Sequence, residues 1–129
     1  MIFFLTSAFI ASANAQVPLD TGIKILYAED ARAFTKDLAA FLTSPKAAVR
    51  ARAALAAGRI GRKEAIEPLG KLLYDKDEIV RSNAAFALGE IESPDAAEML
   101  LTAMGKEKSA VVMASILEAI GKIAAANAK

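Results

Sequence analysis

Small and apolar side chains recur at helical spacing through most of the chain, and the pattern itself repeats. Residues 80–91, VRSNAAFALGEI, have a second copy thirty-one residues upstream and a weaker copy thirty-two residues downstream. In each copy the alanines are expected to allow close approach of a neighbouring helix, and Gly89 is expected to contribute to this contact. A glycine is also expected to close the last turn, Gly58 or Gly61 in the first copy and Gly89 in the second. Units of this kind are suited to stacking on one another. The pattern therefore predicts a stack of short helices.

A second amphipathic helix follows each copy. In the first unit it runs from Lys63 to Tyr74, and Pro68 is tolerable there if Lys63 and Glu64 form a 3₁₀ opening. The thirty-one-residue shift superposes both helices of one unit on those of the next. The superposed pairs are Val49 and Val80, Arg50 and Arg81, Gly58 and Gly89, Ala65 and Ala96, Leu69 and Leu100, and Leu73 and Met104.

The repeat divides the chain into units. Residues 44–74 form repeat one, residues 75–105 form repeat two, and residues 106–129 supply an incomplete repeat three. The segment from Asp30 to Leu42 is expected to be a single helix, the second helix of an earlier half repeat at residues 30–43. Abundant alanine and an aromatic content of only 6% favour an all-α fold.

These units resemble the HEAT-like repeats of the phycobilisome-lyase type. In that family an Asp-containing turn precedes V-R, A-A-x-A-L-G-x-I and then A-x-x-P-L. Residues 75–91 match the turn and the first helix, and residues 65–69, AIEPL, match the last element. The resemblance covers residues 30–126 and implies a short right-handed α-solenoid of antiparallel helix pairs, a HEAT-like or armadillo-like superhelix. It implies a scaffold and no particular activity.

The first fifteen residues, MIFFLTSAFIASANA, are uncharged and end in an A-x-A pattern. We interpret residues 1–15 as a signal peptide that is cleaved before Gln16, although no basic residue precedes the apolar run. A buried first helix is the alternative. Residues 16–29 then form a partly irregular N-terminal lead that is extended from Gln16 to Gly22. Residues 23–29 form either a short helix or a degenerate helix that packs on the next element. The expected location is secreted or periplasmic, with no membrane attachment after cleavage.

Composition narrows the range of functions. A formal net charge of +1 argues against a protein that neutralises many phosphates, so no nucleic-acid partner is expected. The lack of Cys and His removes the common zinc sites, thiol nucleophiles and histidine bases. Neighbouring carboxylates such as Glu90 and Glu92 have no nucleophile or base beside them. We therefore expect no catalytic residue, no metal site and no cofactor.

Two arginines occupy equivalent positions one turn into each first helix. Arg50 and Arg81 are expected to brace the turns between repeats, with Asp75 or Asp77 as partners. Arginine suits this role because its guanidinium can satisfy two acceptors at once. The alternative is a phosphate or carboxylate site, which would require both arginines to be exposed on one ridge.

The predicted partner-binding surface lies on the second helices. In the solenoids that these repeats resemble, the second helices line the concave face, so positions there that point away from the core are candidates. Tyr74 is the one candidate of a type common in binding hot spots. The candidates are Lys36, Glu67, Lys71, Tyr74, Glu98 and Thr102, with Ala40 beside Lys36.

The last helix, from Val111 to about Ala126, has apolar side chains on more than one stripe. Repeat two can bury only part of them, so this open C-terminal end is expected to bind a partner or a second copy. The predicted function is a non-catalytic, exported scaffold that binds an unidentified protein through the concave face and the C-terminal end. A protein related to bilin chromophore lyases and a fragment of a longer array are the alternatives.

Overall fold

The structure is a computed structural model that describes residues 16–129, so the predicted signal peptide at residues 1–15 lies outside the described residues. Seven α-helices and two 3₁₀ turns make up this part of the chain. In order, they are α2 (Leu19–Asp30), α3 (Lys36–Phe41), α4 (Ala47–Ile60), η1 (Lys63–Ala65), α5 (Ile66–Leu72), α6 (Glu78–Ile91), η2 (Pro94–Ala96), α7 (Ala97–Met104) and α8 (Ala110–Asn127).

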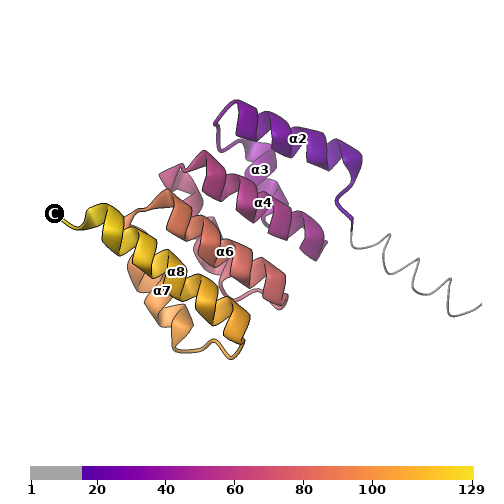
Figure 1. The fold of residues 1–129 in the computed structure, drawn as a ribbon. Helices are drawn as coiled ribbons and strands as arrows, with labels where there is room; N and C mark the ends of the chain where they lie inside the picture. Colours follow the sequence, from indigo (N-terminus) through magenta and orange to yellow (C-terminus); the bar gives the residue numbers. More distant parts are fainter. Residues whose placement is uncertain (1–15) are drawn as a thin grey trace, which may run out of the picture.

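The helices form two layers. Figure 1 shows α2, α4, α6 and α8 side by side in one layer, with α3 and α7 behind them. Helix α5 packs against α6, and its Gly70 touches Met99 of α7. By chain order and by the repeat, the stacked units are α2 with α3, α4 with α5, and α6 with α7, and α8 begins a fourth. The all-α solenoid predicted from the repeat is confirmed.

The buried core runs between the two layers through the whole stack. Its largest fully buried side chains come from every unit, which makes the core continuous from the first helix to the last. They are Ile25, Leu38, Leu42, Leu69, Val80, Leu88, Leu100, Val112 and Ile116.

The N-terminal lead is more regular than predicted. Residues Leu19–Asp30 form helix α2. The prediction of extended chain up to Gly22 is wrong, whereas the helix considered for residues 23–29 is part of α2. Pro18 stands just before the first turn, and its carbonyl accepts a hydrogen bond from the Gly22 amide at 2.9 Å. Proline is well tolerated at this boundary because it removes only an N–H that would have no partner within the helix.

The helix predicted from Asp30 to Leu42 is wrong over its first half. Helix α3 begins at Lys36, because the Thr35 hydroxyl caps it by accepting a hydrogen bond from the Leu38 amide at 3.1 Å. The first unit is therefore a complete helix pair, α2 with α3, and not half a repeat.

The second helix of repeat one opens as predicted. Lys63–Ala65 is a 3₁₀ turn, and α5 begins at Ile66. Pro68 consequently lies in the first turn of α5, where backbone amides have no partner within the helix. Repeat two has the same arrangement, with Pro94–Ala96 as its 3₁₀ turn.

Gly58 and Gly89 lie where neighbouring first helices come closest. A Cβ added to Gly58 would lie 2.6 Å from the Cα of Ala87, and one added to Gly89 would lie 2.8 Å from the Cα of Ala119. Both distances are far shorter than a carbon–carbon van der Waals contact, so a side chain at either position would push the helices apart. These two glycines set the spacing of the stack.

The predicted left-handed glycine cap is confirmed at Gly61 of the first copy, and the prediction that Gly58 or Gly89 closes its helix is wrong. Helix α4 continues to Ile60 and ends at Gly61, which has a left-handed φ of 74°. Helix α6 continues to Ile91 and ends at Glu92, with a φ of 57°. In both helices the left-handed cap lies three residues beyond the glycine, so the glycine sits in the last turn for packing and not for capping.

We expect Gly89→Ala to lower the free energy of unfolding by about 1–3 kcal/mol, because the added methyl group collides with Ala119. Gly22→Ala is the matched control, since a Cβ there meets no atom within 4 Å. That change should raise stability by up to about 1 kcal/mol through helix propensity. Urea unfolding followed by circular dichroism measures both. Wild-type stability of Gly89→Ala would contradict the close-contact role.

Candidate functional site

Five of the six predicted partner-binding side chains line one groove between α5 and α7. The groove has a volume of about 480 Å³. We call it the α5–α7 groove, and its lining residues are Glu67, Gly70, Lys71, Tyr74, Asp95, Glu98, Met99 and Thr102. The sixth predicted residue, Lys36, is exposed on α3 and does not line the groove.

Helical spacing places the polar residues on the rim of the groove. Glu67 and Lys71 are four residues apart on α5, as are Glu98 and Thr102 on α7, so each pair lies on one face of its helix. Tyr74 follows α5, and its ring is open to solvent with Lys106 Nζ 5.6 Å from the ring centre. This distance is within the range of a cation–π contact.

An apolar floor separates the two rims. The Met99 sulfur lies 2.7 Å from the position that a Cβ of Gly70 would occupy, so the missing side chain at Gly70 makes room for the methionine. The predicted candidates on the second helices did not include Met99 or Asp95. A methionine at helical spacing is typical of a buried core position, and only the packing of α5 on α7 shows that Met99 lines the groove.

The rim of the groove is acidic. Lys71 Nζ lies 3.3 Å from Glu67 Oε1, but both side chains are exposed and such a pair is weak. Asp95 is hydrogen-bonded by the Ser93 hydroxyl, and neither Asp95 nor Glu98 forms an ion pair within residues 16–129. The groove thus presents two uncompensated carboxylates beside an apolar floor.

A second set of polar contacts joins the turns between units. Arg50 donates two hydrogen bonds to the Asp75 carboxylate, from Nε to Oδ2 at 2.7 Å and from Nη2 to Oδ1 at 2.9 Å. Its Nη1 donates to the Ser44 carbonyl oxygen at 2.8 Å. The Arg50 and Asp75 side chains are both nearly buried. One guanidinium thereby ties the turn before α4 to the turn before α6.

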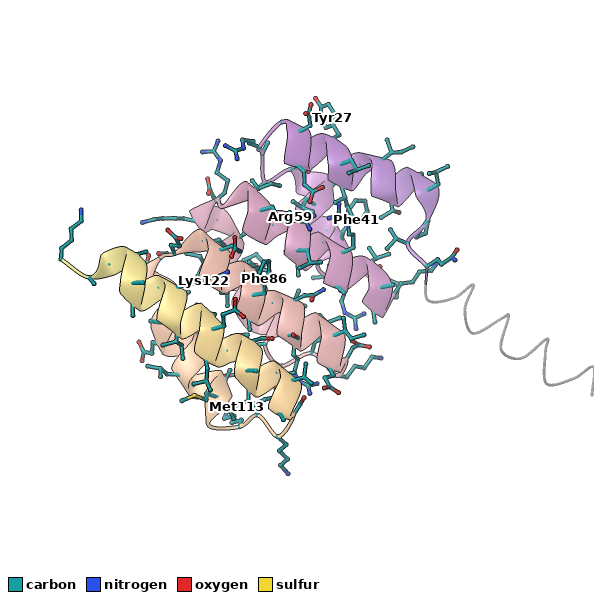
Figure 2. All side chains as sticks on the ribbon, in the orientation of Figure 1. Tyr27, Phe41, Arg59, Phe86, Met113 and Lys122 are labelled. Carbon is teal, nitrogen blue, oxygen red and sulfur yellow. The ribbon has the colours of Figure 1, made fainter. Side chains whose placement is uncertain are left out.

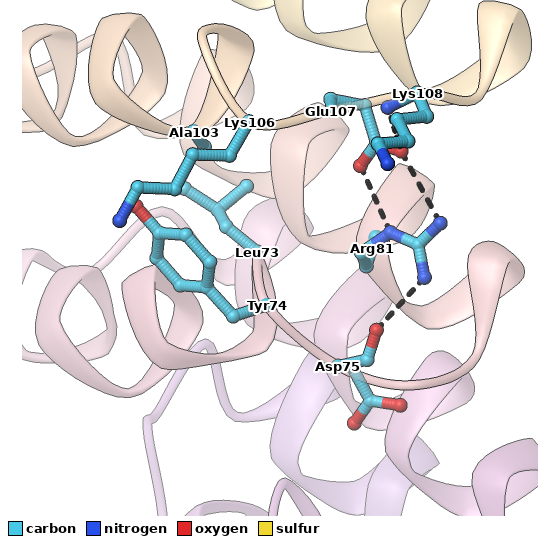
Figure 3. Close-up of a pocket in the computed structure, with 8 residues that line it drawn as sticks. All are labelled: Leu73, Tyr74, Asp75, Arg81, Ala103, Lys106, Glu107 and Lys108. Carbon is cyan, nitrogen blue, oxygen red and sulfur yellow. Dashed lines mark hydrogen bonds and ion pairs between the residues drawn. The ribbon is translucent and has the colours of Figure 1, made fainter.

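The next unit repeats this arrangement, as Figure 3 shows. Arg81 donates from Nε to Glu107 Oε2 at 2.9 Å and from Nη2 to Oε1 at 3.2 Å. Its Nη1 donates to the Asp75 carbonyl oxygen at 2.9 Å. We call these contacts the arginine ladder. It ends at Met113, which occupies the equivalent position in α8.

The ladder differs from the prediction in its acidic partners. Asp75 pairs with Arg50 as expected, but Asp77 caps α6 by accepting hydrogen bonds from the amides of Ile79 and Val80. The prediction did not name Glu107, although the thirty-two-residue shift places it on Asp75. Both guanidinium groups are engaged in the turns, so an exposed phosphate site on one ridge does not fit.

The ladder carboxylates are held in their charged form. Burial raises the pKa of Asp75, but hydrogen bonds from Arg50 and the Asp77 amide outweigh burial and leave the pKa below its usual value. Hydrogen bonds from Arg81 lower the pKa of Glu107, and the amides of Ser109 and Lys108 lower it further. These shifts follow from structural ion pairs.

A separate ion-pair cluster fastens α2 to α4. Arg52 donates to both oxygens of Glu29, at 3.0 and 2.7 Å, and Arg59 donates to Glu29 Oε1 at 3.2 Å. Hydrogen bonds from Arg52 lower the pKa of Glu29. Figure 2 shows Arg59 at this edge of the stack, with Tyr27 on the outer side of α2. The basic side chains of α4 thus have a structural partner.

Helix α8 is the one helix of the described part that is long and apolar enough to span a membrane. Its inner side packs against α6 and α7 through Val112, Ile116, Ala119 and Ile123. Its outer side is largely exposed. Within residues 16–129, no three acidic side chains come together as a possible metal site.

The family model for HEAT repeats matches residues 35–121 of this chain. The matched region begins at the cap of α3 and ends within α8, so it includes the α5–α7 groove and the whole arginine ladder. No curated protein was found to match the chain.

We expect Arg50→Met to lower the free energy of unfolding by about 3–5 kcal/mol at pH 7, because Asp75 then stays buried without its guanidinium. The loss should shrink in acid. The folded-state pKa of Asp75 is depressed, so its contribution is complete above the unfolded pKa of about 4 and disappears as the pH falls through the folded pKa. Urea unfolding at pH 7 and pH 3 measures both effects.

Arg59→Met is the control for this change, since the Arg59 side chain is mostly exposed and its pairing should contribute less than about 1 kcal/mol. An equal loss in the two variants, or a loss for Arg50→Met that is the same at both pH values, would contradict the role of the ladder.

Proposed function

Because the chain belongs to the HEAT-repeat family, we propose that it is a non-catalytic scaffold that binds a protein partner through the α5–α7 groove. HEAT repeats generally mediate protein–protein interaction. The observation that carries the proposal is the position of the groove, which lies between the second helices of adjacent repeats and gathers five separately predicted side chains. Concave surfaces formed by stacked repeats are the usual binding surfaces of solenoids.

The chemistry of the groove favours a cationic segment of the partner. Asp95 and Glu98 have no basic partner within the described residues, so a lysine or arginine would gain an attractive contact there. Met99 and Tyr74 offer apolar surface beside these carboxylates, and methionine and tyrosine are common in binding sites. We therefore propose that the partner presents a basic side chain next to an apolar one.

A catalytic role has less support. The sequence contains no Cys or His, and the exposed Glu67 is paired with Lys71. The alternative of a bilin-lyase relative rests on the resemblance to repeats of the phycobilisome-lyase type. It has little support in the groove, where Tyr74 is the only aromatic lining residue. A planar tetrapyrrole would find few aromatic faces to pack against there.

We expect selection from a library of random twelve-residue peptides to enrich peptides with lysine or arginine beside an apolar residue. Tyr74→Ala should weaken binding of the enriched peptides about tenfold or more, because it removes the aromatic side of the groove. Tyr27→Ala is the matched control, since Tyr27 is also exposed but lies on α2. Fluorescence anisotropy with labelled peptides measures the affinities.

Binding should also weaken as salt is added, because rim carboxylates attract the basic side chains. If no peptide is enriched, or if Tyr74→Ala and Tyr27→Ala have equal effects, the groove is not the binding surface.

We also propose that the chain is exported, on the strength of its uncharged first fifteen residues and the Ala13-Asn14-Ala15 pattern. Expression of the full gene in a bacterium with a periplasm should give a mature protein that begins at Gln16. Intact-mass measurement of the periplasmic fraction tests this. Recovery of the uncleaved chain in the cytoplasm would contradict export.

A further inference from the structure

At the C-terminal end of the stack, the glycine position that packs against the next first helix in the inner units is uncovered. Gly58 of α4 and Gly89 of α6 each receive the backbone of the next first helix, as described above. Gly121 occupies the equivalent position in α8, and a Cβ built on it meets no atom within 4 Å. The close-approach position is therefore preserved in α8, but no helix within residues 16–129 covers it.

Neighbouring positions on α8 and α7 are also exposed where their equivalents in the inner units are buried. Ala54 and Ala85 are fully buried, whereas the equivalent Leu117 is 55% exposed. Gly70 packs against Met99, whereas the equivalent Leu101 is 51% exposed. We call the surface formed by these open positions the end face, and its residues are Leu101, Ala114, Leu117, Ile120 and Gly121.

Exposure of an apolar residue does not by itself place it on the end face. Val111 of α8 is 61% exposed, but its equivalent in the inner unit, Ile79, is 65% exposed as well. The position of Val111 is thus just as exposed in a unit that another unit follows, and it needs no partner. Leu117 and Gly121 differ, because their equivalents are buried wherever another unit follows.

We propose that the end face binds the end face of a second copy of this chain, forming a closed two-fold dimer. Leu117 protrudes from α8, and the open space at Gly121 lies four residues further along the same side of the helix. When two α8 helices pair in antiparallel orientation about an axis near Ala119, each Leu117 lies over the partner's Gly121. Such a surface is self-complementary, as a two-fold interface requires.

The charged side chains of α8 lie beside this face. Lys122 points toward α6, where it pairs with Glu90 and lies over the Phe86 ring. Its Nζ is also 3.6 Å from Glu118 Oε1, so it offsets the charge of Glu118 near the axis. Leu117 and Gly121 are thus left clear for the partner.

The opposite end of the stack does not supply the matching surface for head-to-tail association. Within the chain, each glycine receives an alanine, Ala87 on Gly58 and Ala119 on Gly89. The outer side of α2 instead presents bulky side chains, Leu19, Ile23, Leu26 and Tyr27. These would hold the backbone of α2 away from Gly121. The end face is also separate from the α5–α7 groove, so the dimer does not depend on the function proposed above.

Sedimentation equilibrium of the purified full chain over a concentration series tests the dimer. The expected mass rises to twice that of the purified chain and no further. Leu117→Glu should raise the dissociation constant about 100-fold or more, because two unpaired carboxylates would be buried. Ile79→Glu is the matched control and should leave it unchanged, since Ile79 is equally exposed but lies off the end face. Circular dichroism verifies that both variants are folded.

A cysteine scan fixes the symmetry, because the chain contains no Cys. Glu118→Cys lies next to the axis, so mild oxidation should give a disulfide-linked dimer, whereas Ile79→Cys should stay monomeric on a denaturing gel. The proposal would be overturned by a monomer at every concentration or by masses beyond two copies. It would also be overturned if Leu117→Glu and Ile79→Glu had equal effects, or if Glu118→Cys formed no disulfide.

Discussion

The spacing of the first helices depends on contacts in which glycine meets alanine with no side chain between them. At Gly58 and Gly89 the Cα of the neighbouring helix lies too close to leave room for a Cβ, so α4, α6 and α8 approach closely. Short polar side chains can then reach across. The Asn83 amide donates to the Ala51 carbonyl at 3.1 Å, and the hydroxyls of Ser82 and Ser115 are 2.7 Å apart. Larger residues at the glycines would break these contacts as well as the packing.

The arginine ladder operates at the same spacing. The Arg50 guanidinium, one turn into α4, can donate two hydrogen bonds to Asp75 in the turn before α6 only if the two units are in close contact. The ladder fixes the turns and the glycines fix the helix bodies, so the second helices α5 and α7 are held beside each other. Gly70 then admits Met99 between them, and the α5–α7 groove follows from that fit. The groove is thus a consequence of how the repeats stack.

Much of the fold could be predicted because the repeat keeps its register over two units. The 3₁₀ opening before Pro68 and the pairing of Arg50 with Asp75 follow from local rules and from the shift. The full extent of α2 could not be predicted in the same way, because its apolar residues face both inward and outward: Ile25 is buried, and Leu26 is exposed. The sequence pattern predicted both a close contact and a cap at Gly89, because a glycine near a helix end fits either role. Only the position of Ala119 distinguishes the two.

The two series of contacts that build the stack end in different ways at α8. The arginine ladder stops in the sequence, because Met113 replaces the arginine and has no N–H group to donate to a carboxylate. The glycines at equivalent positions, Gly58 and Gly89, continue with Gly121, which no helix of the described residues covers. Packing of a further unit of the same kind would use both an arginine–carboxylate pair and a close contact at glycine. A two-fold contact between two α8 helices needs only the close contact at glycine. The loss of the arginine together with the retained glycine therefore favours pairing through α8 itself over continuation of the stack.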